Sequence, residues 1–268
     1  MREDEFIDLR KVNLIDDFIE EKILSKRLSI DKKDNTLNYN LFSNLLYRPV
    51  GQDEFSKYTG FYLTFELNRE KLGFDKTEKP GDFDILIIPC SKEKIYFDRT
   101  CAIEVKIVRP NRKNPKKAPN SYGIKQVKGL VQDGFPLVGL LHICMTEPLK
   151  EYEKQTINFD PIPFNIDNPS NNKKFLENVV PVKFDHFSSF SAENQMKRLV
   201  SKDIPKFVGL MTVGVNLTDD GKLMMWFNHD FNNGFSAGYF NPNKKDSTID
   251  RIKSFYKENK SEFKLVRK

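Results

Sequence analysis

Two acidic residues and a lysine stand in a pattern that could do chemistry. Asp84 lies in the apolar segment Gly81–Ile88, and Glu104 and Lys106 lie in the next apolar segment, Ala102–Val108. Alternate side chains of a β-strand point to opposite faces, so Glu104 and Lys106 share one face while their apolar neighbours face a core. Charged groups on an otherwise apolar strand are costly unless they serve a purpose. If the two strands are neighbours, Asp84 and Glu104 converge on one point.

Two converging carboxylates suit a hard divalent cation. Mg²⁺ (or Mn²⁺) prefers carboxylate and carbonyl oxygens and keeps several waters. We therefore expect Asp84 and Glu104 to be metal ligands, with the backbone carbonyl of Val105 as a further one. Such a cation polarises a phosphate oxygen and helps to make hydroxide from water. Lys106 can hold the attacking water or offset charge in the transition state, so the candidate catalytic residues are Asp84, Glu104 and Lys106.

The context of this pattern carries more weight than the Glu-x-Lys string. The string occurs four times in the chain, but only Glu104 and Lys106 are bracketed by β-branched residues and follow an apolar strand that carries Asp. Each residue alone has a structural alternative. Asp84 could satisfy turn amides, and Glu104 and Lys106 could form an ion pair on an exposed face. Asp82 is interpreted as a turn residue.

The pattern resembles the PD-(D/E)XK nuclease superfamily, which includes restriction endonucleases, Holliday-junction resolvases and RecB-like exonuclease domains. The resemblance rests on Gly81-Asp82-Phe83-Asp84, on Ile103-Glu104-Val105-Lys106 and on a following helix with Gln126. It covers roughly residues 50–147. Phe83 stands where the pattern has Pro, a departure that is common in this group.

The resemblance implies roles for five residues. Asp84 and Glu104 would be metal ligands and Lys106 the catalytic lysine. Many members add a glutamate from the first core helix, for which Glu66 and Glu54 are both candidates and Glu66 is preferred. RecB-like members place a glutamine near the site, which here would be Gln126, although a plain surface helix is an equal alternative.

The basic charge of the chain is local. The stretch from Glu104 to Lys128 carries a formal charge of +7, so the rest sums to about −1 against a net charge of +6. A polyanion site needs such a concentration of cations, although a solvated loop that happens to be basic is the alternative. The expected nucleic-acid-binding residues are Arg109, Arg112, Lys113, Lys116, Lys117, Lys125, Gln126 and Lys128.

Hydrophobic periodicity predicts the elements that position these residues. Helices are expected at Leu14–Leu28, at Asp53–Leu72 with Gly73 as C-cap, and at Tyr122–Asp133. Strands are expected at Asp82–Pro89, at Ile95–Val108 as one long or two short strands, and at Leu137–Met145. This order predicts the α/β (α+β) class, with a central mixed sheet flanked by helices. By resemblance, the core would be restriction endonuclease-like.

The C-terminal part is expected to form a β-hairpin and helix extension. Phe207–Val215 and Lys222–Phe227 flank Asp219-Asp220-Gly221, which indicates a hairpin, and Asp246–Phe263 indicates a helix. The expected organisation is a helical segment at 1–50, the nuclease core at 51–147, and an extension at 148–268 that packs on the core.

Several classes of protein find no support in the sequence. No apolar run is long enough for a transmembrane helix, and the charged N-terminus lacks the apolar stretch of a signal peptide. Cys90, Cys101 and Cys144 fit no zinc spacing and are expected to be buried thiols of a cytoplasmic protein. His142 is expected to be a satisfied core residue. Walker, GxGxxG and GxSxG motifs are absent.

The sequence therefore predicts a metal-dependent deoxyribonuclease with Mg²⁺ or Mn²⁺ as cofactor. We expect an endonuclease of restriction, defence or recombination type that acts on double-stranded DNA and does not enter a membrane. A non-catalytic nucleic-acid-binding module on the same fold is the alternative, and a protein whose basic loop binds an acidic partner is a third reading. Related nucleases often work as dimers, which leaves a homodimer open, although no interface signal stands out.

Overall fold

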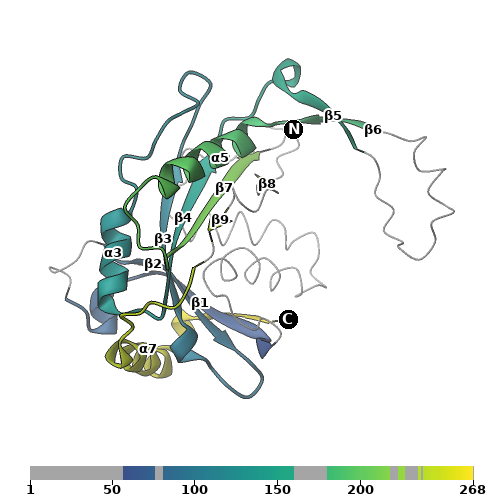
Figure 1. Cartoon of the computed structure of the whole chain (residues 1–268). Helices are drawn as coiled ribbons and strands as arrows, with labels where there is room; N and C mark the ends of the chain where they lie inside the picture. Colours follow the sequence, from purple (N-terminus) through teal and green to yellow (C-terminus); the bar gives the residue numbers. More distant parts are fainter. Residues whose placement is uncertain are drawn as a thin grey trace.

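A mixed β-sheet forms the centre of the protein (Figure 1). The structure, a computed structural model, describes residues 57–75, 81–159, 180–217, 223–226, 235–236 and 238–267. Within these ranges the main sheet has eight strands in the order β10-β1-β2-β3-β4-β7-β8, and β9 pairs with β7. Helices lie against this sheet, so the α/β (α+β) class with a mixed sheet flanked by helices is confirmed. The helix expected at Leu14–Leu28 lies outside the described residues.

The first strands form an antiparallel meander. It consists of β1 (Gly60–Leu67), β2 (Phe83–Cys90) and β3 (Cys101–Val108). The strand expected at Asp82–Pro89 is confirmed as β2. Only the second half of Ile95–Val108 is a strand, because Phe97–Arg99 forms the short 3-10 helix η7 before it. β2 pairs with β3 only from Ile85 to Ile87, so the two strands part before Asp84.

The order of elements then changes from antiparallel to parallel. Helix α3 (Ile124–Asp133) connects β3 to β4 (Leu137–Met145), which runs parallel to β3. Both elements were expected, and the bounds of β4 agree with the predicted strand. In this register Glu104 lies beside Leu140, and Lys106 lies beside His142. The polar face of β3 therefore continues onto β4.

The helix expected at Asp53–Leu72 is wrong over its described part. Residues Gly60–Leu67 form β1, and Arg69–Leu72 form only the short 3-10 helix η6. Phe61, Leu63 and Leu67 are at most 2% exposed, and because they lie an even number of residues apart they share one face of the strand. Gly73 does end η6 in a left-handed conformation with φ 71°, which agrees with its expected role as a C-cap.

The C-terminal half completes the sheet at both edges. Helix α5 (Phe187–Val200) leads to β7 (Gly209–Leu217), which is parallel to β4 and forms the predicted hairpin with β8 (Leu223–Trp226). The short β9 (Phe235–Ser236) also pairs with β7. Helix α7 (Asp246–Glu258) and η10 (Lys260–Glu262) lead to β10 (Lys264–Arg267), which pairs with β1 at the other edge. The helix expected at Asp246–Phe263 is confirmed for most of its length.

A separate two-stranded sheet lies away from the main sheet (Figure 1). It consists of β5 (Gln155–Phe159) and β6 (Val180–Phe184), which pair antiparallel, and the short 3-10 helix η8 (Glu151–Glu153) precedes it. Sequence periodicity did not predict this ribbon. It leads directly into α5.

The three α-helices pack on one face of the sheet (Figure 1). Their apolar side chains form one core with the sheet residues that share a face with Glu104 and Lys106. The core includes Leu86, Ile88, Ala102, Val138, Leu140, Val127, Leu130, Met196, Leu199, Ile252 and Phe255. α5 approaches β7 closely at Gly214, where an added Cβ would lie 2.1 Å from the carbonyl oxygen of Ser188. Only glycine fits there.

A buried ion pair joins η6 to the end of α3. Nη2 of Arg69 lies 2.7 Å from Oδ2 of Asp133, and both side chains are under 5% exposed. The guanidinium also lies over the rings of Phe74 and Phe83. Asp82 accepts a hydrogen bond from the backbone N–H of Arg69, which joins the residue before β2 to the start of η6.

The described residues add two further outcomes. None of their helices is both long and apolar enough to cross a bilayer. Cys90, Cys101 and Cys144 are free and buried, as expected of these thiols.

Candidate active site

The candidate site lies where β2 and β3 separate. Because the ladder between these strands ends at Ile85 and Ile103, backbone pairing no longer joins Asp84 to Glu104. The carboxylate of Asp84 takes over as a partner: Oδ2 accepts a hydrogen bond from the N–H of Val105 across 2.6 Å. The side chain of Asp84 is thereby directed at β3.

All three residues of the predicted catalytic set come together at this point. The carboxyl groups of Asp84 and Glu104 are close enough to share a hydrogen bond. Nζ of Lys106 lies 2.6 Å from Oε1 of Glu104. The side chain of Glu104 is 4% exposed and that of Lys106 is 22% exposed. The acid is therefore buried, and the lysine lies between it and solvent.

The two carboxyl groups have perturbed acidities. The pKa of Glu104 is raised to about 7, because burial and then the negative charge of Asp84 raise it by more than Lys106 lowers it. Burial also raises the pKa of Asp84, against the N–H of Val105 and the charge of Lys106, which lower it. The pair therefore resists carrying two negative charges, as adjacent buried carboxyl groups do. Strongly perturbed acids of this kind are concentrated at functional sites.

Glu66 lies near the pair, but not on a helix. It belongs to β1, and its negative charge raises the pKa of Asp84. The expectation of a helix-borne glutamate is therefore wrong for Glu66, because the segment is a strand. Its backbone has φ 47°, and among the described residues it is the one non-glycine with a left-handed backbone. Such strain is typical of functional sites. Glu54 lies outside the described residues.

Glycine at the start of α3 leaves space for the side chains of the candidate site. Gly123 has φ 72°, and an added Cβ would lie 3.1 Å from Cγ of Glu104 and 3.2 Å from Cε of Lys106. Any other side chain would press on both. Gln126, three residues further on, lies beside Gly81 at the start of β2, with its Cγ 3.6 Å from where a Cβ would be. The helix thus brings Gln126 to the strand that carries Asp84.

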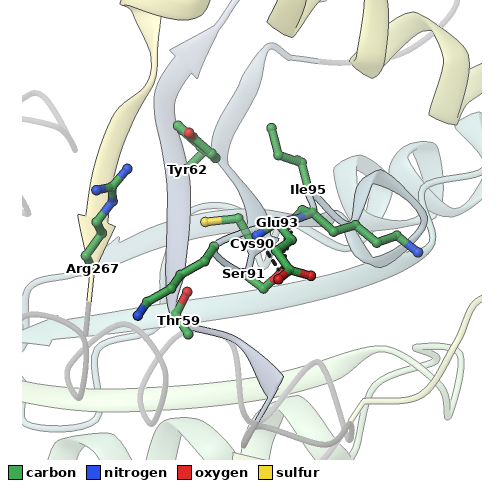
Figure 2. Close-up of a pocket in the computed structure, with 9 residues that line it drawn as sticks. Thr59, Tyr62, Cys90, Ser91, Glu93, Ile95 and Arg267 are labelled. Carbon is green, nitrogen blue, oxygen red and sulfur yellow. Dashed lines mark hydrogen bonds between the residues drawn. The ribbon is translucent and has the colours of Figure 1, made fainter.

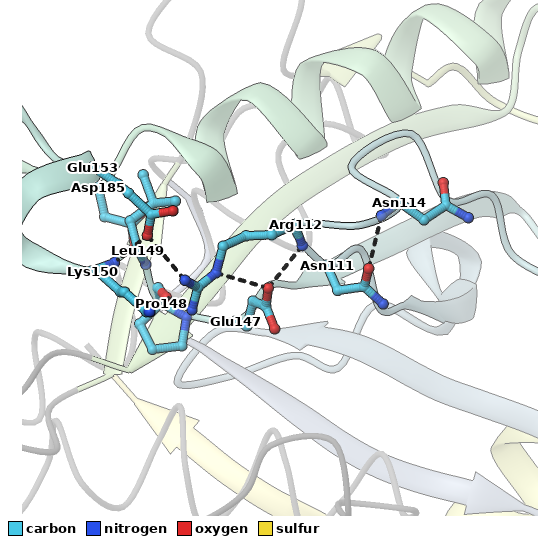
Figure 3. Close-up of polar contacts among 9 residues, drawn as sticks. All are labelled: Asn111, Arg112, Asn114, Glu147, Pro148, Leu149, Lys150, Glu153 and Asp185. Atoms are coloured by element: carbon cyan, nitrogen blue, oxygen red, sulfur yellow. Dashed lines mark hydrogen bonds and ion pairs between the residues drawn. The ribbon is translucent and has the colours of Figure 1, made fainter.

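The predicted nucleic-acid-binding cations differ in their contacts with the protein and in their exposure to solvent. Arg112 is held by protein carboxylates, with Nε 2.9 Å from Glu147 and Nη1 3.1 Å from Glu153 (Figure 3). Lys128 pairs with Asp203 at 2.6 Å, but Asp203 is 97% exposed, so this pair is weak. Arg109 is half-buried. Lys113, Lys116, Lys117 and Lys125 are exposed, and so is Arg112 although its guanidinium is paired.

His142 is a buried and satisfied residue, as expected. Its Nε2 lies 3.2 Å from the carbonyl oxygen of Tyr122, and its Nδ1 lies 2.8 Å from Nε2 of Gln195. Burial lowers its pKa to about 4, so the ring is neutral and donates from Nε2 to the carbonyl. Sequence reasoning missed Gln195 and Arg198 on α5. The helical spacing of Ala192, Met196 and Leu199 could have revealed that helix, but not its polar contacts.

A pocket of about 400 Å³ lies elsewhere, at the β10 edge of the sheet (Figure 2). Thr59, Tyr62, Cys90 and Arg267 line it together with the loop 91–95. None of the predicted site residues lines this pocket. The site at Asp84 is therefore defined by its side chains, not by this cavity.

The donors at the site suit a hard cation in part. Asp84 and Glu104 supply two adjacent carboxylates, and a bound divalent cation would offset the unfavourable charge that raises the pKa of both. Among the residues that the structure describes, no three His, Cys, Asp or Glu side chains form a metal-binding group. A third protein oxygen would have to come from the carbonyl of Val105 or from Glu66 after a local shift.

Comparison with known proteins gives no relative. No protein-family model matches the chain, and neither a curated protein nor a solved structure is significantly similar to it. The functional argument therefore rests on the site itself.

Proposed function

We propose that this chain is a metal-dependent nuclease of the PD-(D/E)XK type, which hydrolyses phosphodiester bonds of DNA. The single observation that carries the proposal is the cluster of Asp84, Lys106 and the buried Glu104 where β2 and β3 separate. The meander β1-β2-β3, followed by α3 and a parallel β4, supports a restriction endonuclease-like core. An endonuclease of restriction, defence or recombination type is the role that we propose.

Mg²⁺ or Mn²⁺ is the proposed cofactor. Asp84 and Glu104 would hold it, with the carbonyl of Val105 as a further oxygen and Glu66 as a third carboxylate. When bound, such a cation polarises the phosphodiester and offsets its negative charge. The buried position of Glu104, 3% exposed, keeps bulk water away from one side of this cluster. Electrostatic interactions are stronger in such surroundings.

Lys106 has the position and charge for a role at the reacting centre. Its ammonium group lies 2.6 Å from Glu104 and remains 22% exposed, so it can donate to a water at the mouth of the site. It can also stabilise the negative charge that develops on the phosphate oxygens. Gly123 leaves room for the side chain of Lys106, because it has no side chain of its own to contact it.

The exposed cations around the site suit the DNA backbone. Lys113, Lys116 and Lys117 lie on the loop that follows β3, and Lys125 lies in the first turn of α3. Lysines bind phosphates by releasing counterions from the duplex, without reading the sequence. We therefore propose double-stranded DNA as the partner, held by this loop and by the start of α3.

Cleavage of supercoiled plasmid DNA tests the proposal. Wild-type protein is incubated with Mg²⁺, with Mn²⁺ and with EDTA, beside Lys106→Met and the matched control Lys71→Met. Lys71 also pairs with a glutamate, at 2.9 Å, but lies on η6 outside the site. Loss of one transition-state donor costs on the order of 100-fold to 1000-fold in rate. We expect that loss for K106M alone, and no cleavage in EDTA.

Two other results would contradict the proposal. Cleavage that K106M leaves unchanged would reject the assigned mechanism. DNA binding without metal-dependent cleavage by the wild type would instead favour a non-catalytic nucleic-acid-binding module.

A further inference from the structure

The basic loop 109–121 is fixed to the protein at Arg112. The backbone N–H and Nε of Arg112 both donate to Oε1 of Glu147, across 2.8 Å and 2.9 Å. Nη1 donates to Glu153 and Nη2 to the carbonyl of Pro148 (Figure 3). Asp185 then joins this segment to α5, because it accepts from the N–H of Leu149 and from the N–H of Phe187. One end of the loop is thus tied to the start of α5.

The same helix holds the loop at a second point, through Arg198. Nη2 of Arg198 donates to the carbonyl of Lys116 across 2.7 Å, and Nη1 donates to the carbonyl of Lys117 across 3.2 Å. These acceptors are backbone atoms, so the lysine side chains are not used by the contact. Lys116 and Lys117 are both exposed.

A hydrogen-bond chain connects Arg198 to the candidate site. Nη1 of Arg198 also donates to Oε1 of Gln195 across 2.9 Å, and Gln195 donates to Nδ1 of His142 across 2.8 Å. His142 donates to the carbonyl of Tyr122, the residue before Gly123. His142 also lies beside Lys106 in the sheet register. The loop and the catalytic strand are therefore held by one network.

We propose that Arg112 and Arg198 are positioning residues that hold the backbone of the basic loop, so that its lysines meet nucleic-acid phosphates beside the site. The use of the loop rests on the proposed function, whereas the holding of its backbone does not. A guanidinium offers five N–H donors in a planar fork, and both arginines direct theirs at protein oxygens. A loop held in place before binding loses less conformational entropy when it binds. The lysines then supply the charge.

Limited trypsin digestion of the free protein tests the holding of the loop. Arg198→Met is compared with Lys197→Met, which removes the same charge and the same tryptic bond type on the neighbouring residue. Lys197 pairs with Glu193 on the same helix. Cleavage after Lys113, Lys116 and Lys117 should rise at least about tenfold in R198M, because local opening becomes easier when these hydrogen bonds are lost. A rate within about twofold of K197M would overturn the proposal.

Arg112→Met provides a second variant of the same kind, and thermal melting confirms that each variant is folded. R112M should also raise cleavage after Lys113, Lys116 and Lys117. Protection of the loop that neither arginine affects would overturn the proposal for both.

A double-mutant cycle on DNA binding tests how Arg198 acts. The dissociation constant of a duplex is measured for wild type, R198M, the pair Lys116→Met and Lys117→Met, and all three together. If Arg198 acts through the lysines, its effect of about tenfold disappears once they are removed, since coupled residues are not additive. Independent effects would mean that Arg198 contacts DNA itself, which overturns the positioning role. A wild type that binds no DNA rejects the proposed function, while the digestion still decides how the loop is held.

Discussion

Replacing Glu104 with glutamine should make the protein more stable at pH 8. Glu104 is 3% exposed, and burial with the charge of Asp84 raises its pKa from 4.5 to about 7. At pH 8 the folded protein therefore holds a buried negative charge that it disfavours. Glutamine keeps the shape without the charge. Lys106 is not left in an apolar setting, because it is 22% exposed and remains close to Asp84.

The pH range of the effect follows from the pKa of Glu104 in the unfolded chain and in the folded protein. Between pH 4.5 and 7, the folded Glu104 keeps a proton that the unfolded chain has released. The free energy of unfolding therefore falls as the pH rises through this range. At about 1.4 kcal/mol per pKa unit, the difference between the pKa of Glu104 in the two states corresponds to about 3 kcal/mol. The free energy of unfolding of E104Q should exceed that of the wild type by about this amount at pH 8 and should equal it at pH 4.

Urea unfolding followed by far-UV circular dichroism, in EDTA at pH 4, 6 and 8, measures this difference. Glu262→Gln is the matched control, since Glu262 pairs with Lys71 at the surface, and such pairs contribute at most about 1 kcal/mol. A gain at pH 8 with loss of cleavage is the expected result for E104Q. An E104Q protein that is less stable than the wild type at pH 8 would refute the reasoning, because the carboxylate would then be stabilised where it lies.

Three further predictions concern the same region. Mn²⁺ at about 100 times its dissociation constant should stabilise the wild type by about 2.7 kcal/mol in thermal melts, but not Asp84→Asn; an equal gain in both would place the cation elsewhere. His142, whose pKa burial lowers from 6.5 to about 4, should reduce stability by about 3 kcal/mol as the pH falls through that range. His142→Gln should remove this slope in urea titrations, and a persisting slope would assign it to other groups. Glu66→Gly should relieve the left-handed backbone at φ 47°, which stabilises by about 1 kcal/mol, while plasmid cleavage slows; a destabilised but fully active variant would contradict both effects.

The buried strands of the site could be predicted because their signal is local. Leu137–Met145 is apolar except for His142 and is buried at each position, as a central parallel strand should be. The alternation around Glu104 placed it and Lys106 on one face, and they are in contact. The convergence with Asp84 needed only the assumption that β2 and β3 are neighbours, which is confirmed.

Other elements depend on contacts that are distant in the sequence. β1 was taken for a helix although its aromatic and β-branched residues favour a strand; pairing with β2 and β10 decides its structure. β10 is a short segment with a charged residue at each end, and it forms a strand by pairing with β1. Nothing near Arg112 in the sequence indicates that its partners are Glu147 and Glu153. The basic run was visible, whereas its division into held arginines and exposed lysines was not.

The pair of Arg69 and Asp133 gives α3 a fixed far end. Asp133 is the last residue of the helix, and the helix begins beside Gly123 at the site. Its ten residues span ~15 Å. A change in the tilt of the helix at Asp133 would therefore displace its first turn at the site. Asp133→Asn would weaken the ion pair with Arg69 without changing a residue of the candidate site. A search for inactive variants should therefore recover substitutions of Asp133 in which Asp84, Glu104 and Lys106 are unchanged.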